Sequence, residues 1–176
     1  MIPLLIRASR GEGRIRRNNS LLYLVRPLLA HRENQTIKST PAMTESILKN
    51  QPDHKWEMML PELGKDSPLF TLLRVNPKTN ATTLLIDFPT ALHIPKHTHE
   101  KSETHFILRG SHLFENSDTG ERFDVRENGY FYLPGHIVHE AWVPAGARAI
   151  IILEDGWKVN WLEGPPTAKD IGRGTP

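Results

Sequence analysis

Residues 97–110 read HTHEKSETHFILRG. Because side chains two apart on a β-strand point to the same face, His97 and His99 would present two imidazoles side by side. The polar residues 100–102 suit a turn into a second strand, which Glu103 would begin. A third imidazole from a distant strand would complete a pocket of three nitrogens and one carboxylate. Such a pocket suits a divalent transition metal and leaves coordination positions open for a substrate.

Histidine is concentrated in the middle of the chain. The 176 residues include nine histidines and no cysteine, and seven of the nine histidines lie between residues 93 and 139. The absence of cysteine excludes a disulfide scaffold, a thiolate metal site and a cysteine nucleophile. A metal would therefore be held by histidine nitrogen and by carboxylate or amide oxygen.

The residues around this stretch predict an all-β fold. From about residue 54 onward, short apolar or alternating runs are separated by turn sequences with Gly and Asn, which is typical of a sandwich or barrel. No convincing helix of three turns follows residue 60, and no repeat of fixed period is present. The expected strands are 54–60, 69–75, 82–88, 91–97, 103–109, 112–115, 122–125, 130–133, 137–143, 148–153 and 157–161.

The spacing of these residues resembles the first motif of the cupin superfamily. That motif is a His-x-His pair, three or four spacers, a glutamate, six residues and a glycine, and residues 97–110 contain every element in register. The second motif ends in a histidine and is matched by Gly129, Pro134 and His139. Two details depart from it, because the interval from Gly129 to Pro134 is one residue shorter than usual and His136 stands at the place of a second glycine. The resemblance covers roughly residues 80–155.

This resemblance implies a double-stranded β-helix, which is a small jelly roll or cupin barrel. It also implies one divalent transition metal inside the barrel, held by His97, His99, Glu103 and His139. Iron(II) is the favoured ion, with zinc, manganese, nickel and copper as alternatives. Four buried ionisable side chains would be costly without a common partner, and a divalent cation satisfies them together.

Other polar residues near the motifs are secondary candidates. His105 lies two residues beyond the glutamate of the first motif and should share its inward face. There it would act as a catalytic base, a substrate contact or a hydrogen-bond donor to a metal ligand, and a core histidine with satisfied hydrogen bonds is an equal alternative. Arg109 shares that face if the strand is regular, or else lies at the rim with its head in water. His136 is expected in a turn, and His93 and His112 are expected to be structural or exposed.

The basic character of the chain is confined to its first quarter. The formal net charge is +2 and the pI is near 9.0. Residues 1–42 hold eight basic and two acidic residues, which leaves 14 basic and 18 acidic residues for the rest. No nucleic-acid-binding motif accompanies the basic residues, and no apolar run reaches the roughly 18 residues of a membrane-spanning helix. Neither nucleic acid nor membrane is therefore expected as a partner.

We expect three regions along the chain. They are a basic, disordered leader over residues 1–42, a cupin domain over residues 43–163 and a loose C-terminal tail over residues 164–176. The leader lacks the pattern of a secretory signal; it resembles an organellar transit peptide, or it is a translated upstream region before a true start at Met43. A cytoplasmic location is expected, or an organellar one if the leader is a transit peptide.

Two classes of function fit these observations. The first is a metal-dependent enzyme: an Fe(II)-type dioxygenase acting on a small chelating substrate, because the chain looks most like stand-alone cupins related to acetylacetone-cleaving or dihydroxyacetophenone dioxygenases. A metal-dependent isomerase could use the same ligands with His105 as base. The second is a non-catalytic sensor of a metal or small ligand, similar to the cupin part of zinc-binding anti-sigma factors.

A homodimer is expected with either function. Cupins often pair through edge strands, and an open sheet edge needs such cover. The alternation Tyr130-Phe131-Tyr132 predicts one face that packs and another that lines a groove or a subunit contact.

Overall fold

The computed structural model describes residues 46–176. The predicted leader over residues 1–42 and the alternative start at Met43 lie outside this range. The described strands are β1 (Glu57–Met58), β2 (Leu69–Val75), β3 (Thr82–Asp87), β4 (Leu92–Thr98), β5 (Glu103–Arg109), β6 (Ser111–Asn116), β7 (Arg122–Arg126), β8 (Tyr130–Leu133), β9 (His139–Val143), β10 (Arg148–Leu153) and β11 (Asn160–Trp161). Three short 3-10 helices are also present, over Gln51–Asp53, Pro61–Asp66 and Ala168–Asp170.

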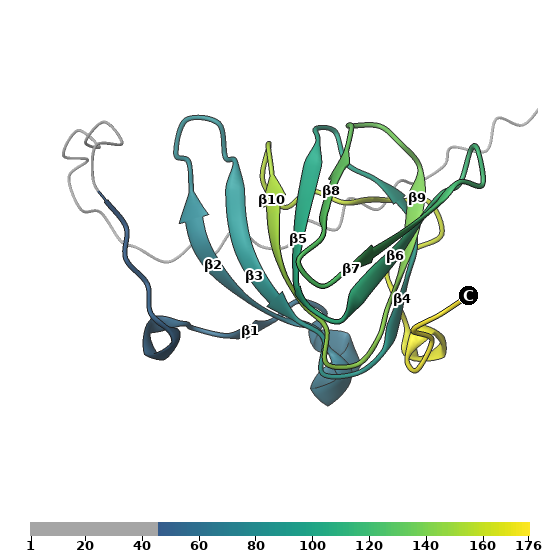
Figure 1. The fold of residues 1–176 in the computed structure, drawn as a ribbon, viewed down its shortest axis with the longest axis horizontal. Helices are drawn as coiled ribbons and strands as arrows, with labels where there is room; N and C mark the ends of the chain where they lie inside the picture. The colour runs from purple at the N-terminus through teal and green to yellow at the C-terminus, as the bar shows by residue number, and fades with distance from the viewer. Residues whose placement is uncertain (1–45) are drawn as a thin grey trace, which may run out of the picture.

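The strands form two antiparallel sheets. One sheet has the order β1-β2-β3-β10-β5-β8 and the other has the order β11-β4-β9-β6-β7. Strands distant in the sequence are neighbours, as in the pairs β3 with β10 and β4 with β9. Figure 1 shows β2 and β3 at one side of the barrel and β4, β6 and β9 at the other. The predicted all-β jelly roll is therefore confirmed.

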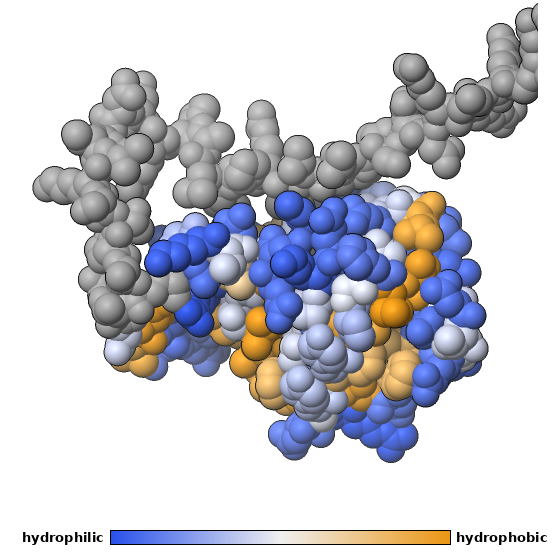
Figure 2. All heavy atoms as spheres, turned by 90° about the horizontal axis from the view of Figure 1, so that it is seen from above, coloured by the Kyte–Doolittle hydropathy of each residue, from blue (hydrophilic) through white to orange (hydrophobic). Residues whose placement is uncertain are grey.

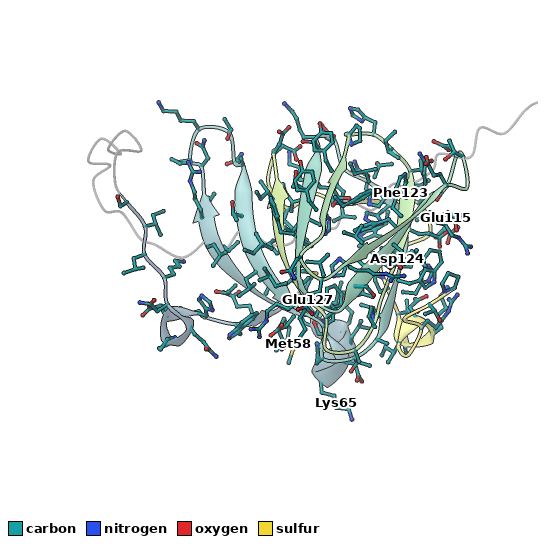
Figure 3. The ribbon with its side chains drawn as sticks, viewed as in Figure 1. Met58, Lys65, Glu115, Phe123, Asp124 and Glu127 are labelled. Carbon is teal, nitrogen blue, oxygen red and sulfur yellow. The ribbon has the colours of Figure 1, made fainter. Side chains whose placement is uncertain are left out.

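Alternate residues of the strands fill the space between the two sheets, because successive side chains of a strand point to opposite faces. On β3, Leu84 and Ile86 are buried in the core. Phe131 points inward from β8 and stacks on Phe114 with ring centroids 4.4 Å apart. Figure 3 shows side chains of both sheets in this space, whereas Lys65 points away from the barrel. The alternation predicted for residues 130–132 is thus confirmed.

Arg109 does not share the inward face of β5. The pairing of β10 with β5 shifts register between Arg148 and Ala149, which interrupts the regular alternation at this end of the strand. The side chain of Arg109 is 57% exposed, and its Nε donates to the carbonyl oxygen of Gly146 at 2.6 Å. Arg109 therefore lies at the rim of the barrel and not in its interior.

The surface carries few large apolar side chains among many polar ones, and Figure 2 shows apolar patches between hydrophilic residues on the face seen from above. No helix within residues 46–176 is long and apolar enough to cross a membrane.

The C-terminal residues 164–176 are packed against the five-stranded sheet, so their description as a loose tail is wrong. Ile171 forms an isolated antiparallel bridge with Leu92 of β4, and the N–H of Gly172 donates to the carbonyl oxygen of Ala91 at 2.7 Å. The Pro- and Gly-rich composition suggested looseness because it contains little apolar side chain to bury. Backbone pairing and the buried side chains of Pro166 and Asp170 hold the segment instead.

The polar one of these two side chains, Asp170, is only 1% exposed. Its Oδ2 accepts hydrogen bonds from the backbone N–H and the hydroxyl of Thr167, at 2.9 and 3.1 Å. Its Oδ1 lies 3.2 Å from Nδ1 of His93, on the outer face of β4. Burial alone would raise the pKa of Asp170, but the hydrogen bonds from Thr167 and His93 outweigh burial and lower the pKa.

We predict that Asp170→Asn lowers the free energy of unfolding by about 1–3 kcal/mol at neutral pH, since buried donors lose their charged acceptor. Because the folded-state pKa of Asp170 is below the ordinary value of 3.8, its contribution is present above that value and is lost as the pH falls through the folded-state pKa. Urea unfolding at neutral and acid pH measures both effects. Lys169→Gln, at the exposed neighbouring residue, is the control. Equal stabilities of Asp170→Asn and the parent chain at neutral pH would contradict the proposal that Asp170 holds the C-terminal segment in place.

Candidate metal centre

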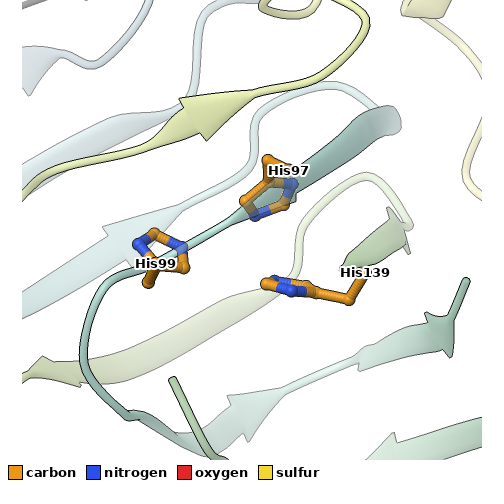
Figure 4. A group of neighbouring side chains, drawn as sticks. All are labelled: His97, His99 and His139. Atoms are coloured by element: carbon orange, nitrogen blue, oxygen red, sulfur yellow. The ribbon is translucent and has the colours of Figure 1, made fainter. Parts of the chain in front are cut away.

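The four predicted ligands lie together inside one end of the barrel, and all four are buried. His97 is near the end of β4, His99 follows β4, Glu103 begins β5 and His139 begins β9. Figure 4 shows the imidazoles of His97, His99 and His139 around a common space. Sequence spacing therefore identified residues that the fold does bring together.

Strand pairing places the two histidine motifs side by side. His97 is the pairing partner of His139 in the ladder of β4 with β9, after a register shift between Ile94 and His97. The ring centroids of His97 and His139 are 4.1 Å apart, and those of His97 and His99 are 5.2 Å apart. The irregularity in β4 turns both motif histidines into the barrel, although they stand five and seven residues after the buried core residue Leu92.

A tight turn locks the second motif onto the first. A Cβ atom on Gly135 would lie 2.6 Å from the carbonyl oxygen of Glu100, so this close approach requires glycine. The next residue, His136, has a left-handed φ of 66° and donates its N–H to the carbonyl oxygen of His99 at 2.8 Å. His136 is thus a turn residue, as predicted, and the turn fixes the start of β9 against the loop that carries the first motif.

The polar atoms of the site converge at short range. The ligand atoms of His97, His99 and His139 all lie within 4.8 Å of one another. Glu103 adds its carboxylate, with Oε1 2.9 Å from Nε2 of His139 and Oε2 3.5 Å from Nε2 of His99. Three imidazole nitrogens therefore form one cluster, and the Glu103 carboxylate lies beside two of them.

Backbone carbonyls fix the orientation of all three imidazoles. A carbonyl oxygen only accepts hydrogen bonds, so each Nδ1 carries a proton and donates a hydrogen bond. In the neutral imidazole this leaves a lone pair on each Nε2. The distances from Nδ1 to the carbonyl oxygen are 2.7 Å for His97 to Pro95, 2.8 Å for His99 to Lys158 and 3.0 Å for His139 to Ile137. Histidines that ligate metals are held in this way.

The carboxylate of Glu103 is buried in a way that favours a bound cation. Its Oε1 is buried without a hydrogen bond of acceptable geometry, although Nε2 of His139 is only 2.9 Å away. A buried carboxylate oxygen without a partner costs free energy. A divalent transition metal with a set of three nitrogens and one oxygen would satisfy this oxygen and the three lone pairs together.

Burial and mutual charge set the protonation of the cluster. Burial lowers the pKa of His97 well below its usual value, with further lowering from His139 and His99, and burial also lowers the pKa of His99. Burial alone would lower the pKa of His139 as well, but the Glu103 carboxylate outweighs it and raises that pKa. Burial raises and the neighbouring histidines lower the pKa of Glu103, with a net value well below the usual one. The carboxylate is therefore charged, and a metal would compete with a proton mainly at His139.

His105 lies beside the centre, as its inward position predicted. Its Nε2 is 3.1 Å from Oε2 of Glu103, and its side chain is buried. It can orient the carboxylate by donating this hydrogen bond. Its role as a catalytic base stays a prediction.

Sequence reasoning missed the contribution of the C-terminal segment. Lys158 supplies the carbonyl that orients His99, and the ring of Trp161 lies 5.0 Å from that of His97. The pairing of β11 with β4, which sets Trp161 opposite His97, places both groups. The apolar run at residues 157–161 indicated a strand, but no local pattern could indicate its partner.

Of the two alternatives expected for His93 and His112, structural or exposed, the structure shows the structural one, because both histidines are buried. His93 is buried on the outer face of β4, with Nε2 2.8 Å from Oε2 of Glu140 and Nδ1 facing Asp170. His112 is buried inside the barrel and is only 2% exposed. The alternation of His112 and Phe114 on β6 was the available signal for the latter.

Solved structures share this fold at low sequence identity. The putative acetylacetone dioxygenase from Methylibium petroleiphilum PM1 has a TM-score of 0.55 and 16% identity, and the match covers 73% of this chain and 90% of that chain. The acetylacetone dioxygenase from Acinetobacter johnsonii has a TM-score of 0.54, 15% identity and coverage of 69% and 80%. The polyketide cyclase RemF from Streptomyces resistomycificus has a TM-score of 0.54, 15% identity and coverage of 67% and 86%. These identities establish a shared fold only.

Sequence comparison with families is more specific. No curated protein matches the chain in sequence. The family described as AraC-like ligand binding domain matches residues 83–175, which is more than half of the chain and includes all four predicted ligands. The chain therefore belongs to the AraC-like ligand-binding domains of the cupin superfamily.

Proposed function

We propose that His97, His99, Glu103 and His139 bind one divalent transition metal, and that this centre is where the protein acts. The observation that carries the proposal is the cluster of three buried histidines, whose ligand atoms lie within 4.8 Å of one another and whose Nδ1 atoms are held by backbone carbonyls, beside the buried carboxylate of Glu103. When bound, such an ion supplies Lewis acidity and, if it is iron(II), activation of dioxygen.

Our first candidate activity is a dioxygenase that acts on a small chelating organic substrate. Four protein ligands leave coordination positions for two oxygen atoms of such a substrate. The apolar core of the barrel would exclude water from the reaction, and it includes Ile107, Phe114, Phe131 and Ile151. Two structures that share the fold carry the name acetylacetone dioxygenase, which supports this reading of the site.

A sensor of a small ligand is the second candidate, and the family match favours it. Members of this family are described as ligand-binding domains, and binding alone requires the centre but no reaction. The two candidates differ in whether the bound ligand is consumed. A metal-dependent isomerase with His105 as base would be recognised by turnover without consumption of dioxygen.

We predict that His99→Ala lowers metal affinity by at least about 100-fold, because the centre loses one nitrogen ligand. Elemental analysis of the purified chain and titration against a chromophoric chelator measure the change. His54→Ala, a histidine outside the barrel, should bind metal like the parent chain. A far-ultraviolet circular dichroism spectrum with unchanged β-signal shows that the variant folds, and unchanged metal content in a folded His99→Ala would refute the site.

We predict that the iron(II)-loaded protein consumes dioxygen when it is supplied with a β-diketone or a hydroxyketone, and that the zinc-loaded protein does not. The reason is that zinc has no redox chemistry but takes the same ligands. An oxygen electrode together with chromatography of the products measures the reaction. Tight zinc binding without oxygen consumption over a panel of chelating ketones would exclude the dioxygenase and favour the sensor.

We also propose that the chain forms a homodimer through the outer face of the six-stranded sheet. Phe106 and Leu108 of β5, together with Tyr130 and Tyr132 of β8, are between 41% and 58% exposed on this face. Strand β8 is the last strand of its sheet, so its outer edge has unpaired backbone groups beside the apolar side chains. A second copy that continues the sheet would cover both.

We predict that Tyr132→Lys shifts the protein from dimer to monomer, because a charge would enter the apolar contact. Light scattering coupled to size-exclusion chromatography measures the mass. Leu162→Lys, at an exposed apolar residue of the other sheet's C-terminal segment, is the matched control. A parent chain that is monomeric at micromolar concentration would contradict the proposal.

A further inference from the structure

Two buried histidines lie inside the barrel beyond the proposed ligands. His105 is on β5, and His112 is on β6, the next strand in the sequence. The centroids of the two rings are 5.6 Å apart, and the ring planes meet at 69°. The ring of His105 is 4.9 Å from Phe114, and the ring of His112 is 5.4 Å from Phe88. These aromatic neighbours offer contact to the rings but no conventional hydrogen-bond acceptor.

One nitrogen of each histidine has no partner. Nδ1 of His105 and Nε2 of His112 are both buried without a hydrogen bond. Buried polar atoms are nearly always hydrogen-bonded, and each exception costs about 1–3 kcal/mol. Two such atoms on adjoining rings inside one barrel point to a polar group of a bound molecule that completes them.

The hydrogen bonds of His105 define the kind of group that fits. Its Nε2 faces the acceptor oxygen of Glu103 at 3.1 Å, so Nε2 carries a proton, and in the neutral imidazole Nδ1 is left with a lone pair. Burial lowers the pKa of His112 to about 3, so this imidazole is neutral and its Nε2 can donate or accept according to its tautomer. The missing group must therefore be able to donate to a neutral His105 and to accept from His112.

A hydroxyl group meets both requirements. A carbonyl or carboxylate oxygen cannot donate to Nδ1 of a neutral His105, whereas a hydroxyl can both donate and accept, and an ammonium group would bring an unpaired charge into an apolar barrel. We infer that His105 and His112 form a hydroxyl-binding subsite, which selects chelating substrates that carry a hydroxyl group beyond the two atoms bound at the centre. This inference rests on the proposed metal centre and refines its substrate class.

A ligand without this hydroxyl leaves two buried nitrogens unpaired. Sites that are built to hydrogen-bond a hydroxyl reject the analogue lacking it for this reason. A permanently held water molecule would satisfy the same two nitrogens, but it would give no preference between the two ligands. The relative affinity of a matched pair of chelators therefore distinguishes a substrate hydroxyl from a water.

The experiment uses the zinc-loaded full chain and isothermal titration with kojic acid and allomaltol. Both chelate a metal through a ketone and an adjacent enol oxygen, and they differ only in the hydroxyl of the hydroxymethyl group of kojic acid. We expect kojic acid to bind about 10- to 100-fold more tightly, which corresponds to the cost of the unpaired nitrogens.

Variants test which residue provides the preference. His112→Phe should abolish it while zinc affinity and allomaltol affinity stay within about threefold of the parent chain, because the ring lies beyond the ligands. His112→Gln should restore part of it, since an amide both donates and accepts. Phe88→Leu changes the packing beside His112 without removing a polar atom, so it should retain the preference.

Each outcome bears on one of the two proposals. Failure of the parent chain to bind zinc would overturn the metal centre and this inference with it. Equal affinity for the two chelators on zinc-loaded protein would overturn the subsite alone, and so would a preference that persists in His112→Phe. Thermal unfolding of each variant confirms that the folded barrel is compared.

Discussion

Three hydrogen bonds from imidazole Nδ1 to backbone carbonyls are the constraint on which the centre depends. Each bond removes the freedom of one ring to rotate and of one proton to move, so the Nε2 lone pairs are preorganised before any ion arrives. The carbonyls come from three separate places in the chain, at Pro95, Ile137 and Lys158. The centre therefore forms only when β4, the turn before β9 and the segment before β11 are all in place.

This dependence connects the site to the C-terminal segment. Residues 157–172 run along the edge of β4 and contact both of its faces. Near the centre, Lys158 and Trp161 support His99 and His97, while at the other end Asp170 reaches His93. Strand β4 thus carries His93, which contacts Asp170, and His97, which belongs to the proposed centre. The segment thus acts as part of the barrel wall although it contains only two residues of regular strand.

The sequence predicted the parts of the structure that depend on short-range periodicity. Alternation placed most strands, and the spacing of His97, His99, Glu103 and His139 marked residues that the fold brings together. Contacts between distant segments left no such pattern. The backbone carbonyl of Lys158, which accepts the hydrogen bond from His99, is present in every residue type, so the side-chain pattern of the sequence could not reveal it.

Irregular backbone also limited what could be predicted. Arg109 was expected to face inward only if β5 was regular, and the register shift beside Arg148 moves it to the rim. Asp170 appeared in a segment of loop-forming composition, yet one buried carboxylate with three neighbouring donors outweighs that composition. In both cases the decisive term is a long-range hydrogen bond or pairing, which composition and alternation do not contain.

The family match and the dioxygenases of similar fold need not indicate opposing functions. A ligand-binding cupin and an oxygenase cupin both need a dry pocket, and the proposed centre with three nitrogens and one oxygen would hold a chelating ligand in either. The difference lies in what surrounds the ligand beyond its chelating atoms. Beyond the centre, the described strands β5 and β6 place two buried side-chain polar atoms without a hydrogen bond, which are Nδ1 of His105 and Nε2 of His112. Because an unsatisfied pair inside an apolar wall is costly, discrimination among ligands should depend on these two residues more than on the metal, whichever function the chain performs.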